Sequence, residues 1–251
     1  MTAEDKTRLA ALLDTAGDFL RDGHWRERET PVFEDDVTVD NAAQTIAGDG
    51  GGDSLEAAAA IAAIAAIAAE VRECRACGLC DLRILPVPGE GVQRPLVLVV
   101  GEAPGSEEDE RGKPFVGVAG HLLDRMLASI NLSRETNCFI TNTVKCRPPG
   151  NRDPSPEETE ACASFLARQI RVLRPAYILC MGRIAAQTML RTSEGIGRLR
   201  GTFFDYTPDS AAGAPAIPLI ATYHPSALLR DANLKRPAWE DLKKLLARLQ
   251  T

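Results

Sequence analysis

The sequence predicts an α/β fold in which a parallel sheet carries helices on both faces. Four apolar segments read as buried strands, at residues 96–100, 139–144, 177–181 and 219–223. Helical segments separate or follow them, at 119–130, 156–173, 183–191 and 237–249. Three of the strands run into polar segments that contain glycine or proline. Because parallel sheets bind ligands beyond the carboxyl ends of their strands, we expect a site assembled from several strand ends.

An acidic N-terminal extension precedes this pattern. Residues 1–73 carry 16 acidic and 6 basic side chains, a net charge of −10. Residues 74–251 carry 19 acidic and 23 basic side chains, a net charge of +4. The second part is therefore the one suited to a polyanion, although the whole chain has a net charge of −6.

Three elements are expected in the extension. Residues 1–23 have helical periodicity and predict a short helix that docks on the main domain or on a partner protein. Residues 24–53 are polar, acidic and glycine-rich at their end, which predicts a flexible linker. Residues 54–71 are rich in alanine and predict a helix with one narrow apolar stripe. The main domain is expected to cover residues 72–251.

The location follows from the absence of a long apolar run and from the cysteines. No run of apolar residues is long enough for a transmembrane helix, and the start lacks a secretory signal. Seven cysteines, an odd number with clustered spacing, fit metal ligation in a reducing compartment. We expect a cytoplasmic monomer that contacts no membrane.

Four cysteines occur as two pairs that are far apart in the chain. Cys74 and Cys77 form a C-x2-C motif, and Cys146 and Cys162 follow the second predicted strand. Four thiolates hold either an iron–sulfur cluster or a zinc ion, and the spacing does not choose between them. Cys80 offers an alternative C-x2-C pair with Cys77.

The first strand ends in the loop GEAPG. Gly101, Pro104 and Gly105 predict a tight turn whose backbone approaches a ligand closely, or an ordinary strand-to-helix loop. The loop matches neither a Walker A sequence nor GxGxxG, so nucleotide hydrolysis and dinucleotide binding lose support. Phe115 follows in FVGVAG and belongs either to the core or to a surface that stacks on a planar ligand.

The second strand ends in TNTVKCRPPGNR. Asn142 can present a donor and an acceptor to a base edge, or it can cap a loop. Lys145, Arg147 and Arg152 are candidates for contacts with phosphate, or they are solvated charges.

The last strand ends in HPSALL. His224 is one of only three histidines, and its place at a strand end makes it a catalytic candidate beside a purely structural alternative. Leu228 and Leu229 are expected at a loop tip, where exposed leucines could wedge into a base stack. Core positions are the alternative for both.

In this order, the motifs resemble those of the family 4 uracil-DNA glycosylases. The resemblance covers residues 72–249 and rests on C-x2-C-x-L-x3-R, GEAPG, GKPFVGVAG, TNTVKCRPPGNR with a later cysteine, and HPSALL. It implies a three-layer α/β/α sandwich around a four-stranded parallel sheet and a [4Fe–4S] cluster on the four cysteines named above. It also implies a DNA repair enzyme that flips uracil out of single- or double-stranded DNA and hydrolyses the N-glycosidic bond, leaving an abasic site.

The resemblance also implies roles for particular residues. Phe115 would stack on the extruded uracil, Asn142 would read O4 and N3–H, and His224 would hydrogen-bond O2. Glu108 would crowd C5 and so exclude thymine. The expected uracil-binding set is Gly101, Ala103, Glu108, Phe115, Asn142 and His224. The expected DNA-binding set is Lys145, Arg147, Arg152, Arg200, Ser226, Leu228 and Leu229.

One position departs from the better-known branch of the superfamily. That branch has an aspartate before the proline of the first motif, to aim the attacking water, and this chain has Ala103. The adjacent Glu102 is the candidate substitute, so the expected catalytic set is Glu102, Asn142 and His224. A related subgroup that traps DNA covalently carries a histidine in a basic insertion after the second strand. The segment CRPPGNRDP, which follows Lys145 here, has no such histidine, so the resemblance disfavours covalent trapping.

Two other classes of function compete with this interpretation. The first is an iron–sulfur module that binds damaged DNA or accompanies a polymerase, with weak or no excision. The second is an iron–sulfur electron carrier. Asn142, Phe115 and His224 at strand ends argue against both.

Overall fold

The computed structural model describes residues 50–208 and 215–250, with side chains from residue 56 onward in the first range. The predicted helix over 1–23 and most of the predicted linker over 24–53 lie outside these residues. The chain divides into two compact units, Met1–Glu56 and Ala57–Thr251. The sheet and the sites described below lie in the second unit.

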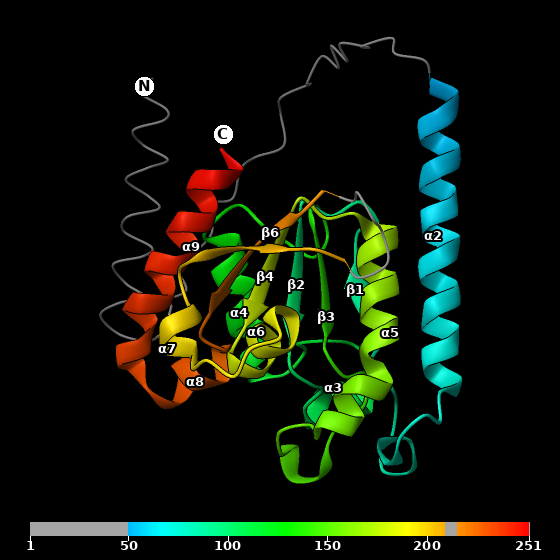
Figure 1. The fold of residues 1–251 in the computed structure, drawn as a ribbon, viewed down its shortest axis with the longest axis horizontal. Coiled ribbons are helices and arrows are strands. Elements are labelled where there is room, and N and C mark those ends of the chain that lie inside the picture. Colours follow the sequence, from blue (N-terminus) through cyan, green and yellow to red (C-terminus); the bar gives the residue numbers. More distant parts are fainter. Residues whose placement is uncertain (1–49, 209–214, 251) are drawn as a thin grey trace, which may run out of the picture. The chain divides into compact units, whose positions relative to one another are not determined.

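A six-stranded sheet forms the centre of this unit (Figure 1). Its order is β1-β3-β2-β4-β6-β5, and the four inner strands are parallel. The strands are β1 (Glu90–Gly91), β2 (Val97–Gly101), β3 (Cys138–Asn142), β4 (Tyr177–Met181), β5 (Phe203–Tyr206) and β6 (Ile217–Thr222). The expected four-stranded sheet was therefore incomplete, because β1 and β5 pair antiparallel at the two edges.

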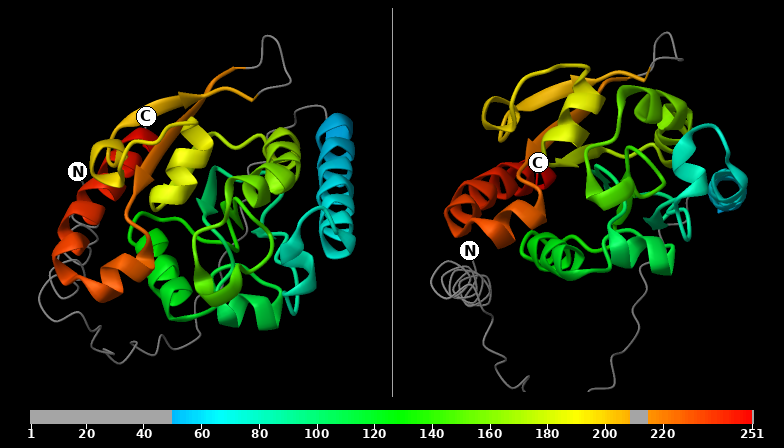
Figure 2. Two further views of the ribbon diagram at one scale, coloured as in Figure 1. Left: turned by 60° about the horizontal axis from the view of Figure 1, so that its bottom comes forward. Right: turned by 90° about the horizontal axis from the view of Figure 1, so that it is seen from below.

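Helices cover both faces of the sheet, which confirms the predicted α/β/α layering (Figure 2). Helices α5 and α6 lie on one face, and α4, α8 and α9 lie on the other. The helices are α2 (Gly50–Glu73), α3 (Ser106–Arg111), α4 (Val118–Ala128), α5 (Pro156–Leu173), α6 (Arg183–Leu190), α7 (Ile196–Leu199), α8 (Pro225–Arg230) and α9 (Lys235–Leu249). Short 3-10 turns occur at η1 (Gly78–Asp81), η2 (Pro149–Asn151) and η3 (Ala232–Leu234).

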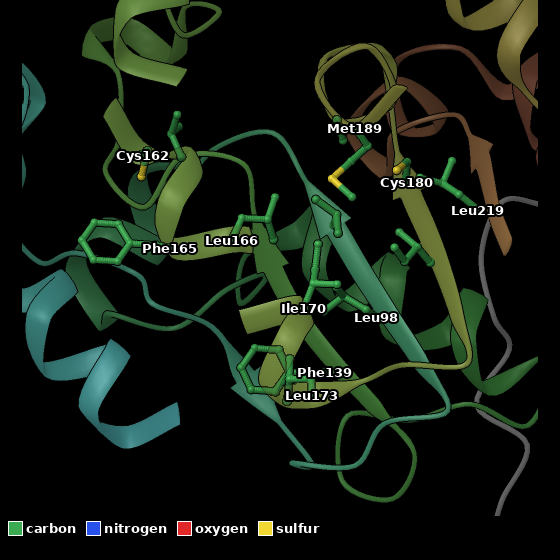
Figure 3. Packing of buried hydrophobic residues seen from close by; sticks show 14 of the residues in the cluster. Leu98, Phe139, Cys162, Phe165, Leu166, Ile170, Leu173, Cys180, Met189 and Leu219 are labelled. Carbon is green, nitrogen blue, oxygen red and sulfur yellow. The ribbon is translucent and has the colours of Figure 1, made fainter. Parts of the chain in front are cut away.

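Burial on both faces explains why the inner strands read as continuous apolar runs. Every residue of β2 and β3 is buried. One core cluster lies between the sheet and the helices α2, α5, α6 and α7. Figure 3 shows α5 contributing Phe165, Leu166 and Ile170 to it, opposite Leu98 and Phe139 from the strands.

Helix α2 joins this core through its apolar stripe. The helix is longer than the predicted range of 54–71, and Ile64, Ile67 and Val71 are buried in the cluster. On its outer surface, Glu70 forms an ion pair with Arg168 of α5. Among the described helices, none combines the length and apolar character that crossing a bilayer requires.

The stripe gives a test of how α2 packs. Ile67 is 2% exposed and Ile61 is 53% exposed on the same helix. We expect Ile67→Ala to lower the free energy of unfolding by about 2–5 kcal/mol, since it opens a cavity in the core. Ile61→Ala is the matched control and should change it by less than about 0.5 kcal/mol. Chemical denaturation followed by circular dichroism measures both, and equal values would contradict this packing.

Candidate functional site

A cavity of about 530 Å³ opens where the inner strands end. Its walls come from the segments that follow β2, β3, β4 and β6, as the strand-end argument predicted. It is lined by Glu102, Ala103, Pro104, Gly105, Glu108, Phe115, Ala119, Asn142, Pro148, Asn151, Arg152, Asp153, Gly182, Arg183, Ile196, Tyr223, His224, Ser226, Ala227 and Arg230. The three residues expected to contact a base, Phe115, Asn142 and His224, therefore share one cavity.

The amide of Asn142 lies in this cavity without a partner. Asn142 is the last residue of β3 and is 1% exposed. Among the described side chains, its Nδ2 and Oδ1 are the only buried nitrogen or oxygen atoms that make no hydrogen bond. Leaving such a group unpaired costs about 1–3 kcal/mol. The unpaired amide is the clearest sign that this cavity receives a polar ligand.

Gly101 permits the close approach of the two ligand-facing groups. A Cβ at this position would lie 2.3 Å from Asn142 Oδ1 and 2.6 Å from Phe115 Cζ. Any side chain larger than hydrogen would therefore displace both the amide and the ring. This is a direct steric reason for glycine at the first position of GEAPG.

Arg134 holds Phe115 in an unusual backbone conformation. Phe115 is buried and has a φ of 52°, in the left-handed region. Arg134 Nη1 and Nη2 donate to the carbonyl oxygens of Pro114 and Phe115, each at 3.0 Å. Asp124 pairs with the same guanidinium at 2.7 Å. The sequence did not identify Arg134, because the contact joins residues from separate segments and no motif marks it.

Glu108 ties together two loops that form the cavity wall. Its carboxylate accepts hydrogen bonds from the backbone N–H groups of Gly105 (3.0 Å), Val116 (2.8 Å) and Gly117 (3.0 Å). The GEAPG loop and the loop that carries Phe115 are thus held by one side chain. The expectation that Glu108 crowds C5 of a pyrimidine stays a prediction.

His224 is held as a neutral hydrogen-bond donor. Nδ1 accepts from the backbone N–H of Ser226 at 3.2 Å, and the hydroxyl oxygen of Ser226 lies 2.8 Å away. Burial, reinforced by the charge of Arg230, lowers the pKa of His224 to about 4, although Glu108 opposes the shift. A neutral ring that accepts at Nδ1 carries its proton on Nε2. Nε2–H is therefore the donor that remains for a ligand.

Glu102 supplies a carboxylate whose proton affinity is raised. Burial and the negative charge of Asp153 raise its pKa to about 6, against the opposing charge of Arg183. Arg183 and Asp153 form an ion pair with each other, 2.5 Å from Nη2 to Oδ2. Neither residue belongs to the sets expected from the sequence. Both nevertheless line the cavity.

Two of the predicted DNA contacts are corrected, and a third lies outside the cavity lining. Lys145 is 1% exposed and its Nζ is bonded to interior groups, so it cannot meet a phosphate. Leu228 is also 1% exposed and packs inward, so it cannot act as a wedge. Arg200 does not line the cavity; its guanidinium pairs with Asp241 at 2.7 Å and lies over the ring of Tyr223, and its contact with DNA stays a prediction.

The other predicted DNA contacts lie at or near the cavity mouth. Arg152 and Ser226 line the cavity, and Leu229 is 47% exposed on α8. Arg147 is half-buried and donates to Asn151 Oδ1 at 2.8 Å. Arg230, which was not predicted, adds an exposed cation to the cavity wall.

The cysteines gather around a second, small hollow between the end of α2, η1 and α5. It is lined by Cys74, Cys77, Cys80, Cys146 and Cys162, together with Val71, Ala76, Arg83, Lys145, Ala161 and Phe165. None of the described cysteines forms a disulfide, and Arg83 Nη1 donates to Cys146 Sγ at 2.9 Å. Among the described side chains, no group of three or more His, Cys, Asp or Glu is arranged to hold a single metal ion.

Comparison with known proteins gives the family. The model of the uracil DNA glycosylase superfamily matches residues 88–243. A type-4 uracil-DNA glycosylase of Archaeoglobus fulgidus is 44% identical over 163 residues, which are 63% of this chain and 79% of the relative. One of Thermotoga maritima is 42% identical over 161 residues, 63% and 80% of the two chains. A type-5 uracil-DNA glycosylase of Pyrobaculum aerophilum is 32% identical over 177 residues, 65% and 74%.

The range matched by the family model includes the sheet and every residue that lines the cavity. The chain belongs to the uracil DNA glycosylase superfamily and, within it, to the type-4 uracil-DNA glycosylases.

Proposed function

We propose that this protein flips uracil out of single- or double-stranded DNA and hydrolyses its N-glycosidic bond, leaving an abasic site. The unpaired amide of Asn142 carries the proposal. Its Nδ2 donates to uracil O4 and its Oδ1 accepts from N3–H, so one side chain satisfies that edge of the base. Cytosine presents the opposite order of donor and acceptor. Release of free uracil from a single-stranded oligonucleotide is the direct test.

The base is expected to rest against Phe115 after leaving the helix. The ring centroids of Phe115 and His224 are 5.6 Å apart and the ring planes are tilted by 34°. A base that stacks on Phe115 is therefore expected to lie within reach of His224 as well. Flipping costs a few kcal/mol, which stacking on Phe115 offsets in part. Leu229, exposed on α8, is the candidate to fill the gap left in the stack. Arg152, Arg183 and Arg230 line the cavity and Arg147 bonds to Asn151 in its wall, so these four cations are the candidates for contacts with the DNA backbone.

Charge develops on two groups as the C1′–N1 bond breaks. The sugar becomes positive, and the departing uracil becomes negative at O2. His224 donates Nε2–H to that oxygen, and its lowered pKa keeps the ring neutral at ordinary pH. One well-placed donor of this kind contributes about 3–4 kcal/mol to the transition state. We expect this to be the largest catalytic contribution of a single side chain.

Glu102 is the proposed base for the attacking water. It lines the cavity beside Ala103, where the better-known branch has its aspartate. A general base typically contributes about 10²–10⁴-fold. Because the sugar is already electrophilic when water arrives, we expect Glu102 to contribute less than His224.

We propose that Cys74, Cys77, Cys146 and Cys162 hold a [4Fe–4S] cluster. The donor set supports this, since the hollow has five thiols and no carboxylate or imidazole. When bound, the cluster supplies covalent cross-links between the segment after α2, the loop after β3 and α5.

We further propose that the protein is a monomer, that it is located in the cytoplasm, and that residues 1–70 bind a protein partner.

Removal of the imidazole should impair excision more than removal of the carboxylate. We expect His224→Ala to lower the single-turnover rate on uracil-containing single strands by about 10²–10³-fold. Glu102→Gln should cause a smaller loss, for the reason given above. His121→Ala, on an exposed position of α4, is the matched control and should leave the rate unchanged. The reverse ranking of His224 and Glu102 would refute the proposed order of contributions.

The rate of excision should fall on acidification in two stages. Glu102 acts when ionised, so the rate is expected to drop as the pH falls through about 6. His224 acts when neutral, so a second drop is expected through about 4. A single-turnover pH series measures both. In Glu102→Gln the stage near 6 should be missing; if it persists, another group is responsible for it.

Loss of one predicted ligand should remove the cluster. We expect Cys162→Ser to yield colourless, unstable protein without iron or acid-labile sulfide. Cys80→Ser and Cys180→Ala are the matched controls, and both should keep the colour, iron and sulfide. A coloured and stable Cys162→Ser protein would exclude the assigned ligand set, and zinc in place of iron and sulfide in the wild type would exclude the cluster.

A further inference from the structure

A buried lysine lies directly behind the amide that reads the base. Lys145 is 1% exposed, and its Nζ donates to Thr141 Oγ1 (2.6 Å), to the carbonyl oxygen of Asn142 (2.8 Å) and to Gln169 Oε1 (2.8 Å). All three acceptors are uncharged. A buried cation is costly, and none of the described carboxylates pairs with this Nζ, so the three hydrogen bonds have to offset part of the cost.

The main chain of the same residue contacts the thiol hollow. The backbone N–H of Lys145 donates to Cys162 Sγ at 3.3 Å, and the next residue is Cys146. The carbonyl oxygen of Lys145 accepts from the N–H of Val87 at 2.7 Å. Lys145 therefore lies between the cysteines at its backbone and Asn142 at its ammonium group.

The peptide group that follows Asn142 is held from two sides. Lys145 Nζ bonds its carbonyl oxygen, and the N–H of Thr143 donates to the carbonyl oxygen of Gly101 at 2.9 Å. The Asn142 side chain has no hydrogen bond of its own. Its orientation toward a base therefore depends on how firmly this backbone and the surrounding packing are held.

We propose that Lys145 is a positioning residue for base recognition: its ammonium group fixes the backbone of Asn142, so that the amide meets the edge of the flipped base. The same residue links that backbone to Cys146 and Cys162, so the cysteine hollow and the base-reading amide share one support. This inference rests on the proposed uracil excision. A displacement of about 1 Å in such a group can cost about 10²-fold in rate.

The test replaces Lys145 with methionine, which keeps the length of the side chain and removes the donor. We expect Lys145→Met to lower the single-turnover rate of uracil excision by about 10²-fold. Its affinity for abasic-site DNA should be unchanged, since that product offers no base to Asn142. Lys243→Met, an exposed lysine of α9, is the matched control and should leave the rate unchanged.

A double-variant cycle separates positioning from a general structural role. If Lys145 acts through Asn142, Lys145→Met should add no further loss to that of Asn142→Ala. Losses that multiply, or an unimpaired Lys145→Met enzyme, would overturn the inference. A wild-type protein that releases no uracil would instead overturn the proposed function. If Lys145→Met does not fold, Gln169→Met takes its place in the same cycle. A partial loss of excision rate that is absent when Asn142→Ala is also present would support the inference. Rate losses that multiply, or no loss of rate in Gln169→Met, would overturn it.

Discussion

The register between β2 and β3 is the constraint on which the base pocket depends. It pairs Gly101 with Asn142 at the ends of the two parallel strands. With no side chain on Gly101, the Asn142 amide and the Phe115 ring approach the same point. A slip of one residue would turn the amide to the opposite face of the sheet. The core that fixes this register therefore also fixes the recognition of the ligand.

Burial in one cavity gives two titratable groups complementary properties. Desolvation disfavours the charged form of each, so it lowers the pKa of His224 and raises that of Glu102. For His224 this keeps the ring neutral, with a hydrogen-bond donor at Nε2, at a pH above about 4. For Glu102 the same burial makes a stronger base but brings its protonation close to neutral pH. Under the proposed roles, this cavity would stabilise the departing base more than it would activate the water, in accord with Ala103 at the position of the usual aspartate.

The sequence predicted what strand ends and periodicity determine. The inner strands were evident because both faces are buried, whereas β1 and β5 are short and partly exposed and left no clear pattern. Phe115, Asn142 and His224 were singled out from motifs that follow strands, and they line one cavity, while their roles stay predictions. Lys145 and Leu228 were misassigned because a motif does not show which way a side chain turns. Leu228 and Leu229 are neighbours on one helix, yet one is buried and the other exposed.

The loop between β3 and α5 shows why a cross-link is useful beside this cavity. Its residues Pro148, Asn151, Arg152 and Asp153 form one wall, yet its only regular element in the described structure is the short turn η2. Ion pairs of Arg152 with Glu158 and of Asp153 with Arg183 hold its exposed part, and exposed pairs contribute little. Cys146 and Cys162 lie in and after this loop and line the same hollow. Metal–thiolate bonds there would join this loop to α5 at Cys162, which is part of the core cluster.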